Sequence, residues 1–372
     1  MIEFRAVGKA YPDGTVALQS LSLTAREGQI TVLVGPSGCG KTTTLRMVNR
    51  MVDPTSGQVL LDGVDVAGSE PSSLRRGIGY VIQNAGLFPH RTVLDNVATI
   101  PVLLGRSRHE ARTTAAELLE RVGLDPRVGS RYPAQLSGGQ QQRVGVARAL
   151  AGDAPVLLMD EPFSAVDPVV RADLQDELLR LQSDLGRTIL FVTHDIDEAI
   201  RLGDMVAVLR VAGASGATGG RSGANSGLAQ FATPAELLSS PADDFVAEFV
   251  GRDRGYRRLQ FLGAGELALT DLPTDPADGG WVLLLDDDRR PTAWRHGGDG
   301  EEVAVGSLHR VDGDGTAGTD GGSLRSALDA ALSSPAGRGV AVDADGRLLG
   351  GIEAEAVITL LHRSTDAAGA SR

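Results

Sequence analysis

The sequence predicts an α/β protein in which helices cover a largely parallel sheet. Short apolar runs typical of buried strands recur along the chain, at 30–34, 59–61, 78–82, 156–159, 189–192 and 205–209. Helical patterns lie between several of these runs, with apolar residues on one helical face at Leu174, Leu178, Leu181 and Leu185. Alternation of strands and helices favours parallel pairing, because each helix returns the chain to the same edge of the sheet.

The segments before residue 150 differ in their periodicity. Residues 1–34 alternate apolar and polar positions and end in the apolar run Ile30–Val34, which predicts a buried strand. Residues 35–43 then turn into a helix. Residues 87–150 contain no convincing strand, and Glu110–Val122 carries apolar residues at helical spacing. We therefore expect a helical subdomain over about 87–150, inserted in the α/β core.

Two breaks in composition organise the second half of the chain. Residues 211–227 are a low-complexity run of small residues that cannot bury a core, and we expect a loop that expands a hairpin tip. A boundary is expected near 251–257, after a helical stretch at 242–250. The predicted domains are thus 1–252 and a small α+β domain at 257–372, with strand candidates at 281–285, 303–305, 340–342 and 348–352.

Charge and composition narrow the class of protein. The 372 residues carry a net charge of −12, and from Asp253 onward 12 Arg stand against 20 Asp and Glu, which argues against nucleic acid or anionic lipid as a partner. Cys39 is the only cysteine, so no intrachain disulfide is possible. No apolar run approaches the ~20 residues that cross a bilayer, and the N-terminus reads as a strand rather than a signal peptide. We expect a protein of the cytosol.

The first chemical motif lies between the strand at 30–34 and the helix that follows. It fits the pattern G-x-x-x-x-G-K-[ST], in which glycines let backbone N–H groups wrap around phosphates. Lys41 and Lys9 are the only lysines, and Lys41 is expected to reach the β- and γ-phosphates of ATP. Thr42 is expected to bind Mg²⁺. The predicted nucleotide-binding residues here are Gly35, Pro36, Ser37, Gly38, Cys39, Gly40, Lys41, Thr42 and Thr43.

Cys39 fills a small position of this loop. A helix N-terminus lies next to it, and such a helix end can lower the pKa of a thiol.

Polar side chains follow three more of the predicted strands. Asp160 and Glu161 come at the end of the strand 156–159, where ligands bind in open α/β sheets. Asp160 is expected to hold Mg²⁺ and Glu161 to act as general base on the attacking water. His194 follows the strand 189–192 and is expected to sense the γ-phosphate. Gln83 follows the strand 78–82, where it can touch Mg²⁺ or the water.

Two further segments complete the predicted nucleotide site. Ser137 is expected to cap a helix that begins near Gly138, with Gly139 and Gln140 letting a phosphate approach the helix end. This second phosphate-binding element is redundant in one chain but useful if it closes on ATP held by a second copy. Tyr11, in a loop before the Gly-rich motif, is expected to stack on adenine.

Together these residues resemble the nucleotide-binding subunit of ABC transporters over roughly residues 1–250. The resemblance implies a P-loop NTPase (RecA-like) fold with an additional antiparallel β subdomain, and head-to-tail dimers that bind ATP between two copies. It identifies Gly35–Thr43 as the Walker A loop, Gln83 as the Q-loop, Leu136–Gln140 as the signature, Glu161 as the catalytic base, His194 as the switch histidine and Asp167 as part of the D-loop, in which Val166 replaces the more usual Leu.

Within that family, the segments 80–90 and 233–253 are similar to ATPases of osmoprotectant importers, which carry glycine betaine, choline, carnitine or proline betaine. The resemblance implies integral-membrane permease subunits as partners, an extracytoplasmic binding protein acting indirectly, and a location at the cytoplasmic face of the membrane. Such subunits often end in tandem CBS repeats. Here Ser323–Gly350 is similar to one CBS repeat, and the first repeat, around 259–296, is degenerate.

Three alternatives stay open at this point. An importer of polyamines, amino acids or sugars has the same cassette, although those subunits often end in a β-barrel. A non-transport ABC ATPase of DNA repair or translation usually carries two cassettes or long coiled coils, neither of which this chain shows. A purely regulatory nucleotide-binding module would not depend on Glu161.

Overall fold

The computed structural model describes residues 1–83, 85–164, 166–211, 227–251, 253–265, 267–274, 280–297, 300, 302–311 and 322–369. The chain forms two compact units, Met1–Val250 and Gly251–Arg372. The predicted low-complexity loop lies mostly outside the described residues, which end at 211 and resume at 227. Within the described part, no helix combines the length and the apolar character that a membrane span requires.

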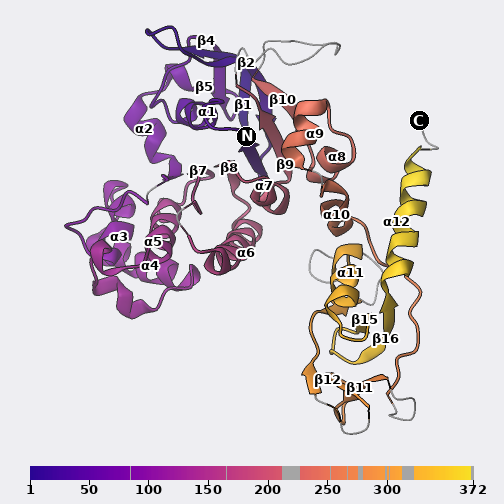
Figure 1. Ribbon diagram of the computed structural model, residues 1–372. Coiled ribbons are helices and arrows are strands. Elements are labelled where there is room, and N and C mark those ends of the chain that lie inside the picture. The colour runs from indigo at the N-terminus through magenta and orange to yellow at the C-terminus, as the bar shows by residue number, and fades with distance from the viewer. Residues whose placement is uncertain are drawn as a thin grey trace. The chain divides into compact units, whose positions relative to one another are not determined.

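A six-stranded sheet forms the centre of the first unit (Figure 1). Its spatial order is β10-β9-β3-β8-β7-β6, and all neighbours pair in parallel except β10 with β9. The strands run Ile30–Val34 (β3), Ile78–Val81 (β6), Val156–Asp160 (β7), Thr188–Thr193 (β8), Met205–Leu209 (β9) and Leu228–Ala232 (β10). The prediction of a largely parallel sheet is confirmed.

Both faces of this sheet are covered, which explains why its central strands are apolar throughout. Every residue of β3, β7 and β8 is buried. Successive side chains of a strand point to opposite faces, so Val32 packs in one core and Leu33 in another. The Val32 core includes helices of the 87–150 segment, and the Leu33 core includes the first helix and the antiparallel strands.

An antiparallel sheet of order β2-β1-β4-β5 contributes to the second of these cores. Its strands are Ile2–Ala10 (β1), Val16–Ala25 (β2), Ser56–Leu61 (β4) and Val64–Asp65 (β5). The buried side chains of β1 are Ile2, Phe4 and Val7, in keeping with a strand that has one face in the core.

The predicted helical subdomain contains α3 (Val93–Leu103), α4 (Arg108–Arg121) and α5 (Gly138–Leu150), which group together beside the sheet (Figure 1). Ser107 and Glu110 form a reciprocal capping box that starts α4. The first unit's other helices are α1 (Lys41–Val48), α2 (Pro71–Arg76), α6 (Pro168–Leu185), α7 (Ile196–Leu202), α8 (Pro234–Ser239) and α9 (Asp244–Val250). On α6, Leu174, Leu178 and Leu181 are buried as the sequence predicts, whereas Leu185 at the end of the helix is only half-buried.

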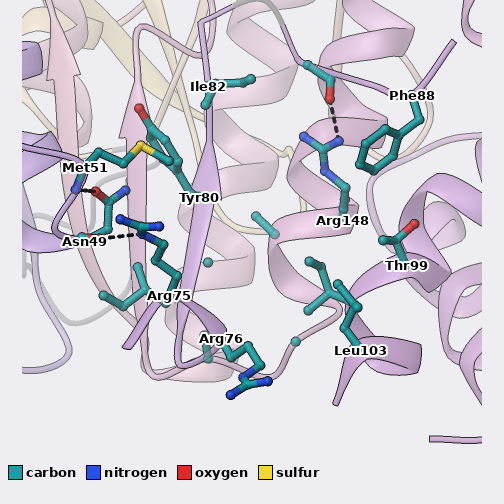
Figure 2. A pocket seen from close by; sticks show the side chains of 17 residues that line it. Asn49, Met51, Arg75, Arg76, Tyr80, Ile82, Phe88, Thr99, Leu103 and Arg148 are labelled. Carbon is teal, nitrogen blue, oxygen red and sulfur yellow. Dashed lines mark hydrogen bonds between the residues drawn. The ribbon is translucent and has the colours of Figure 1, made fainter. Parts of the chain in front are cut away.

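A hollow of about 430 Å³ opens between β6 and this helical group (Figure 2). Its lining is largely apolar and includes Tyr80, Ile82, Phe88 and Leu103. Arg148 of α5 reaches over it and donates hydrogen bonds to the carbonyls of Ala85 and Gly86, both at 2.7 Å. The segment that follows Gln83 is thereby tied to α5.

The second unit contains two three-stranded sheets with orders β11-β12-β13 and β14-β15-β16. Strand β14 pairs with β15 in parallel and β15 with β16 in antiparallel fashion. The elements are α10 (Arg254–Arg258), β11 (Trp281–Leu285), β12 (Pro291–His296), β13 (Glu302–Ala304), β14 (Leu308–Arg310), α11 (Leu324–Ser333), β15 (Arg338–Val342), β16 (Leu348–Glu353) and α12 (Ala354–Gly369). Leu283, Trp294, Val340 and Val342 pack together in one core that joins the two sheets.

The chain carries a native probe in each unit, because the only cysteine is buried in the first and both tryptophans lie in the second. We expect Leu283→Ala to lower the stability of the second unit by about 2–5 kcal/mol, since it opens a cavity in the core around Trp294. Urea unfolding followed by tryptophan emission then shifts to lower denaturant, while exposure of the Cys39 thiol does not shift.

The matched control is Leu158→Ala, which removes a buried side chain from β7 in the first unit. It is expected to shift exposure of the Cys39 thiol to lower urea concentration and to leave the urea dependence of tryptophan emission unchanged. A single transition that moves in both probes for both variants would contradict independent unfolding of the units.

Candidate nucleotide-binding site

The Gly-rich loop joins β3 to α1 and is held tightly against neighbouring backbone. Gly35 has φ +155°, and a Cβ there would lie 2.3 Å from the carbonyl oxygen of Leu209. Gly40 has φ +94°, and its Cβ would lie 2.3 Å from the carbonyl oxygen of Ala17. Only glycine fits at both positions. A Cβ at Gly38 would meet nothing within 4 Å, so the loop leaves space there for a ligand.

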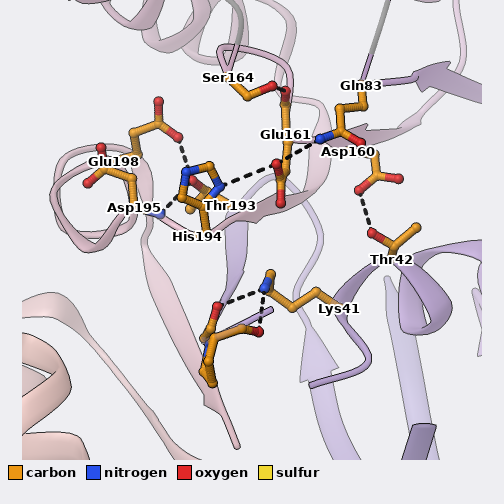
Figure 3. Close-up of polar contacts among 12 residues, drawn as sticks. Lys41, Thr42, Gln83, Asp160, Glu161, Ser164, Thr193, His194, Asp195 and Glu198 are labelled. Carbon is orange, nitrogen blue, oxygen red and sulfur yellow. Dashed lines mark hydrogen bonds and ion pairs between the residues drawn. The ribbon is translucent and has the colours of Figure 1, made fainter. Parts of the chain in front are cut away.

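Lys41 lies inside this loop rather than in solvent. The residue is only 6% exposed, and its ammonium donates to the carbonyl oxygens of Gly35 at 2.7 Å and Pro36 at 3.0 Å (Figure 3). These contacts keep a positive charge at the loop that the glycines form. A compact ammonium in such a loop is suited to bind phosphate oxygens.

Thr42 and Asp160, both predicted metal ligands, are brought together. The Thr42 hydroxyl donates a hydrogen bond to Oδ1 of Asp160 at 2.9 Å (Figure 3). Burial raises the pKa of Asp160 above its ordinary value, although the bond from Thr42 and nearby arginine and lysine act in the opposite direction. A hydroxyl and a carboxylate in contact are oxygen donors of the kind that Mg²⁺ prefers.

Glu161 connects the other two predicted catalytic residues. Its Oε2 accepts a hydrogen bond from Nε2 of Gln83 at 3.0 Å and lies 3.3 Å from Nδ1 of His194 (Figure 3). The backbone of Glu161 has φ +45°, a strained conformation for a residue with a side chain, and its N–H donates to the carbonyl of Val192. Gln83, also predicted as a metal ligand, is thus bonded to Glu161, while Thr42 and Asp160 bond to each other.

The predicted signature segment begins α5. The Ser137 hydroxyl accepts from the N–H of Gln140, and the Gln140 side chain accepts from the N–H of Ser137. Gly138 and Gly139 are the first two helical residues, so the predicted cap at Ser137 is confirmed. Asp167 precedes α6, and its carbonyl accepts from the N–H of Arg171.

Tyr11 lies in the turn between β1 and β2, with the Lys9 ammonium 5.2 Å from its ring centre. Strand β2 passes beside the Gly-rich loop, since Ala17 approaches Gly40. The turn that carries Tyr11 therefore leads directly into the strand that contacts the phosphate loop.

Cys39 fills a buried position of the loop, and the helix end does not lower the pKa of its thiol. The side chain is buried, and this burial raises the pKa of the thiol instead of lowering it. Lys41, whose Nζ lies 3.8 Å from the sulfur, acts in the opposite direction but does not outweigh the loss of solvation. The effect of the nearby helix end on the pKa is outweighed because packing of the loop excludes water from the thiol.

Thr193 and Glu198 lie behind His194 and were not singled out by the sequence. The Thr193 hydroxyl donates to Oε2 of Glu198 at 2.6 Å, and both side chains are buried. The spacing Asp195-x-x-Glu198 suggests a carboxylate that turns back to cap α7. Instead, Glu198 turns inward, toward Thr193.

A family model described as ABC transporter matches residues 18–164. Over 267 residues, covering 72% of this chain and 82% of the relative, the chain is 46% identical to the glycine betaine uptake system ATP-binding protein YehX of Escherichia coli. The chain belongs to the ATP-binding subunits of ABC transporters.

Further members of the family are similar in sequence. The chain is 46% identical over 254 residues to the glycine betaine/carnitine/choline transport ATP-binding protein OpuCA of Bacillus subtilis, which covers 68% of this chain and 63% of OpuCA. It is 45% identical over 280 residues to the osmoprotectant import ATP-binding protein OsmV of Salmonella typhimurium, covering 74% of this chain and 70% of OsmV. The match thus spans somewhat less than two thirds of OpuCA. The resemblance to osmoprotectant importers is confirmed.

Solved structures of the family share the cassette fold. A dimeric ATP-binding cassette, MJ0796, described as a post-hydrolysis state bound to ADP and Pi, matches with a TM-score of 0.53 and 34% identity, covering 56% of this chain and 94% of that chain. The cbiO1 protein of Clostridium perfringens matches with a TM-score of 0.56 and 27% identity, covering 64% and 90%. The predicted P-loop fold of the first unit is confirmed.

The buried charge of Asp160 is expected to lower the stability of the cassette when no nucleotide is bound. We expect Asp160→Asn to raise the free energy of unfolding near pH 7, because it removes a charge that burial disfavours and leaves an oxygen to accept from Thr42. Folding raises this pKa, so the penalty of the charged form is fully present above the folded-state pKa. The gain from Asn therefore disappears as the pH falls toward about 4.

The measurement is urea unfolding of the first unit at several pH values, followed by exposure of Cys39. Asp173→Asn, which changes an exposed carboxylate on α6, serves as the control and is expected to have little effect. A loss of stability in Asp160→Asn at pH 7 would show that the charge at this position stabilises the cassette.

Proposed function

We propose that this chain hydrolyses ATP to power the import of a quaternary ammonium osmoprotectant through a separate membrane permease. The observation that carries the proposal is the gathering of Lys41, Thr42 with Asp160, and Glu161 with Gln83 and His194 at one edge of the sheet. The relatives named above have the same cassette and are named for betaine, choline and carnitine transport.

The residues fit ATP and Mg²⁺. Space above Gly38 and the buried ammonium of Lys41 suit the β- and γ-phosphates, and Gly35, Pro36, Ser37, Cys39, Gly40 and Thr43 complete the loop. Thr42 and Asp160 would hold Mg²⁺, and Gln83 would join them when the site closes. When bound, Mg²⁺ would neutralise charge on the phosphate oxygens. Tyr11 would stack on adenine.

Three side chains of the chain would have separate roles in hydrolysis. Glu161 would accept a proton from the attacking water, and its strained backbone fixes the carboxylate at the end of β7. Gln83 donates to the same oxygen that faces His194, so both side chains orient this carboxylate. His194 would contact the γ-phosphate, because its ring is 58% exposed and stands beside Glu161.

Each complete site would need two copies of the chain. Gly138 and Gly139 begin α5 beyond the Ser137 cap, and unpaired N–H groups at such a helix start favour a phosphate. Because Lys41 already serves the phosphates within one copy, we assign Ser137, Gly138, Gly139 and Gln140 to the ATP of a second copy or of a closely related subunit. Asp167 would lie at the same interface.

The permease would dock beside Gln83. The hollow in Figure 2 is lined mainly by apolar side chains, and the large apolar side chains of Met51, Phe88 and Leu103 at its rim are exposed. Exposed apolar surface around a groove is typical of a protein contact. A permease seated here would place this chain at the cytoplasmic face of the membrane, with an extracytoplasmic binding protein acting through the permease.

The second unit would be regulatory. Its second half runs β14, α11, β15, β16 and α12, a strand–helix–strand–strand–helix order that supports the resemblance of Ser323–Gly350 to a CBS repeat. In the described part of 259–296 the structure has the hairpin of β11 and β12 in place of that order, in keeping with a degenerate first repeat. We therefore infer a degenerate tandem CBS-like domain at 257–372.

The function is tested by co-purifying the chain with its permease and reconstituting the complex in vesicles. Glycine betaine, choline, carnitine or proline betaine, supplied with the binding protein, is expected to stimulate ATP hydrolysis. Glu161→Gln is expected to lower hydrolysis at least about a hundredfold while ATP still binds, because the general base is lost. Lys41→Ala is expected to lose ATP binding. Transport by Glu161→Gln at the wild-type rate would contradict the proposal that ATP hydrolysis by this chain drives transport. Stimulation by polyamines alone would contradict a quaternary ammonium compound as the transported solute.

Shared sites are tested by mixing two variants. Gly139→Asp places a carboxylate at the second residue of α5, where it favours the helix start and has room at 3.4 Å from Val170, yet repels a phosphate. We expect Gly139→Asp and Lys41→Ala to be inactive alone. An equal mixture regains about a quarter of wild-type ATP hydrolysis, since half of random dimers contain one intact site.

Gly139→Asn has nearly the same shape without the charge and is expected to keep most of the activity. A mixture that remains as inactive as its components would contradict sites formed by two copies.

A further inference from the structure

A buried polar network holds the turn that carries His194. Thr193 is the last residue of β8, and its hydroxyl accepts the N–H of Asp195 at 3.0 Å while it donates to Oε2 of Glu198 at 2.6 Å. The residues on both sides of His194 are therefore linked through one hydroxyl. Figure 3 shows Asp195 and Glu198 on one side of His194 and Glu161 on the other.

Glu198 connects this turn to α6. The side chain is 7% exposed, its Oε1 accepts from Nε2 of Gln175 at 3.3 Å, and Nε of Arg171 lies 3.9 Å away. Arg171 also lies 3.7 Å from Asp195 and donates to the carbonyl of Val166, just before Asp167. Burial raises the pKa of Glu198. A buried carboxylate lowers stability unless its partners compensate, and an apolar residue would fill the space at lower cost.

The ring of His194 has little to hold it in place besides this turn. It is largely exposed, and within the described part of the chain its polar contact is with Glu161, at 3.3 Å. Its position relative to Glu161 is therefore fixed mainly by the backbone of 193–195. Displacement of a catalytic group by about 1 Å costs up to a hundredfold in rate.

We propose that Thr193 and Glu198 are positioning residues that hold His194 against Glu161 by anchoring the 193–195 turn to α6. The inference rests on the proposed ATP hydrolysis. Neither side chain forms a hydrogen bond or ion pair with the phosphate loop 35–43, all of which the structure describes, so both act on the chemical step through His194 and leave nucleotide binding to Lys41 and its loop.

The decisive variants are Thr193→Val and Thr193→Ser in the full-length chain. Valine has nearly the shape of threonine and favours strands, so β8 is retained while the hydroxyl is lost. We expect Thr193→Val to lower kcat about tenfold or more with KM for ATP unchanged. Thr193→Ser keeps the hydroxyl and is expected to stay within about twofold of wild type. Equal kcat in Val and Ser variants overturns the proposal.

Glu198 is tested by a similar pair. Glu198→Gln keeps an oxygen for Thr193, and its amide can donate to Gln175 after that side chain flips, so kcat is expected to hold within about twofold. Glu198→Leu removes the hydrogen bonds without leaving a buried charge and is expected to fold with wild-type stability or better but to lose kcat like Thr193→Val. Loss of stability with kcat retained shows a merely structural role.

A double-variant cycle identifies the route of the effect. In the His194→Ala background Thr193→Val is expected to change kcat no further, because its target is absent. If the two substitutions instead lower kcat by the product of their separate effects, the proposal is overturned.

NMR of the labelled histidine rings reports the placement of His194 without turnover: its signals are expected to move in Thr193→Val and not in Thr193→Ser. If wild type hydrolyses no ATP, the proposed function fails, and unmoved signals in Thr193→Val separately refute the positioning role.

Discussion

Parallel register in the central sheet is the constraint on which the site depends. Val34 pairs with Thr193, Val192 with Asp160, and Met159 with Val81, so four strands end at one level. The loops that follow carry Lys41, Glu161, His194 and Gln83 from positions far apart in the chain. Even the backbone of Glu161 is held by the neighbouring strand, through the carbonyl of Val192. A shift of one residue in any strand would turn its side chains to the opposite face and separate these groups.

The same edge of the sheet contains charges that do not favour the fold. Asp160 and Glu198 have pKa values raised by burial, and Lys41 is almost inaccessible to solvent. Each has polar partners, which offset part of the lost hydration. Glu161 adds a strained backbone at the end of β7. Stability of this kind of site comes from the apolar strands around it, whose central members are buried along their whole length. The buried apolar strands thus offset the free-energy cost of the polar groups at their ends.

The sequence predicts much of this and fails where contacts are long-range. Apolar runs gave the parallel strands, and the spacing of Gly35, Gly40 and Lys41 gave the loop, because these signals are local. The raised pKa of the Cys39 thiol does not follow from the local sequence, because it depends on burial in a core shared with residues distant in the chain. Glu198 went unnoticed because its partners, Thr193 on β8 and Gln175 on α6, meet it only in three dimensions. The contacts of the Glu161 carboxylate with both Gln83 and His194 likewise arise only from the tertiary structure.

Within one copy, the polar groups of the site satisfy one another. Lys41 bonds to its own loop, Thr42 to Asp160, and Glu161 faces both Gln83 and His194. Under the proposed function, binding of ATP must exchange these contacts for phosphate and water, and the exchange is favourable only if new partners replace the old. The start of α5 offers N–H groups that its own cap leaves free for an anion. A second copy that presents Gly138 and Gly139 would supply those partners, which links closure of two chains to the release of Glu161 for chemistry.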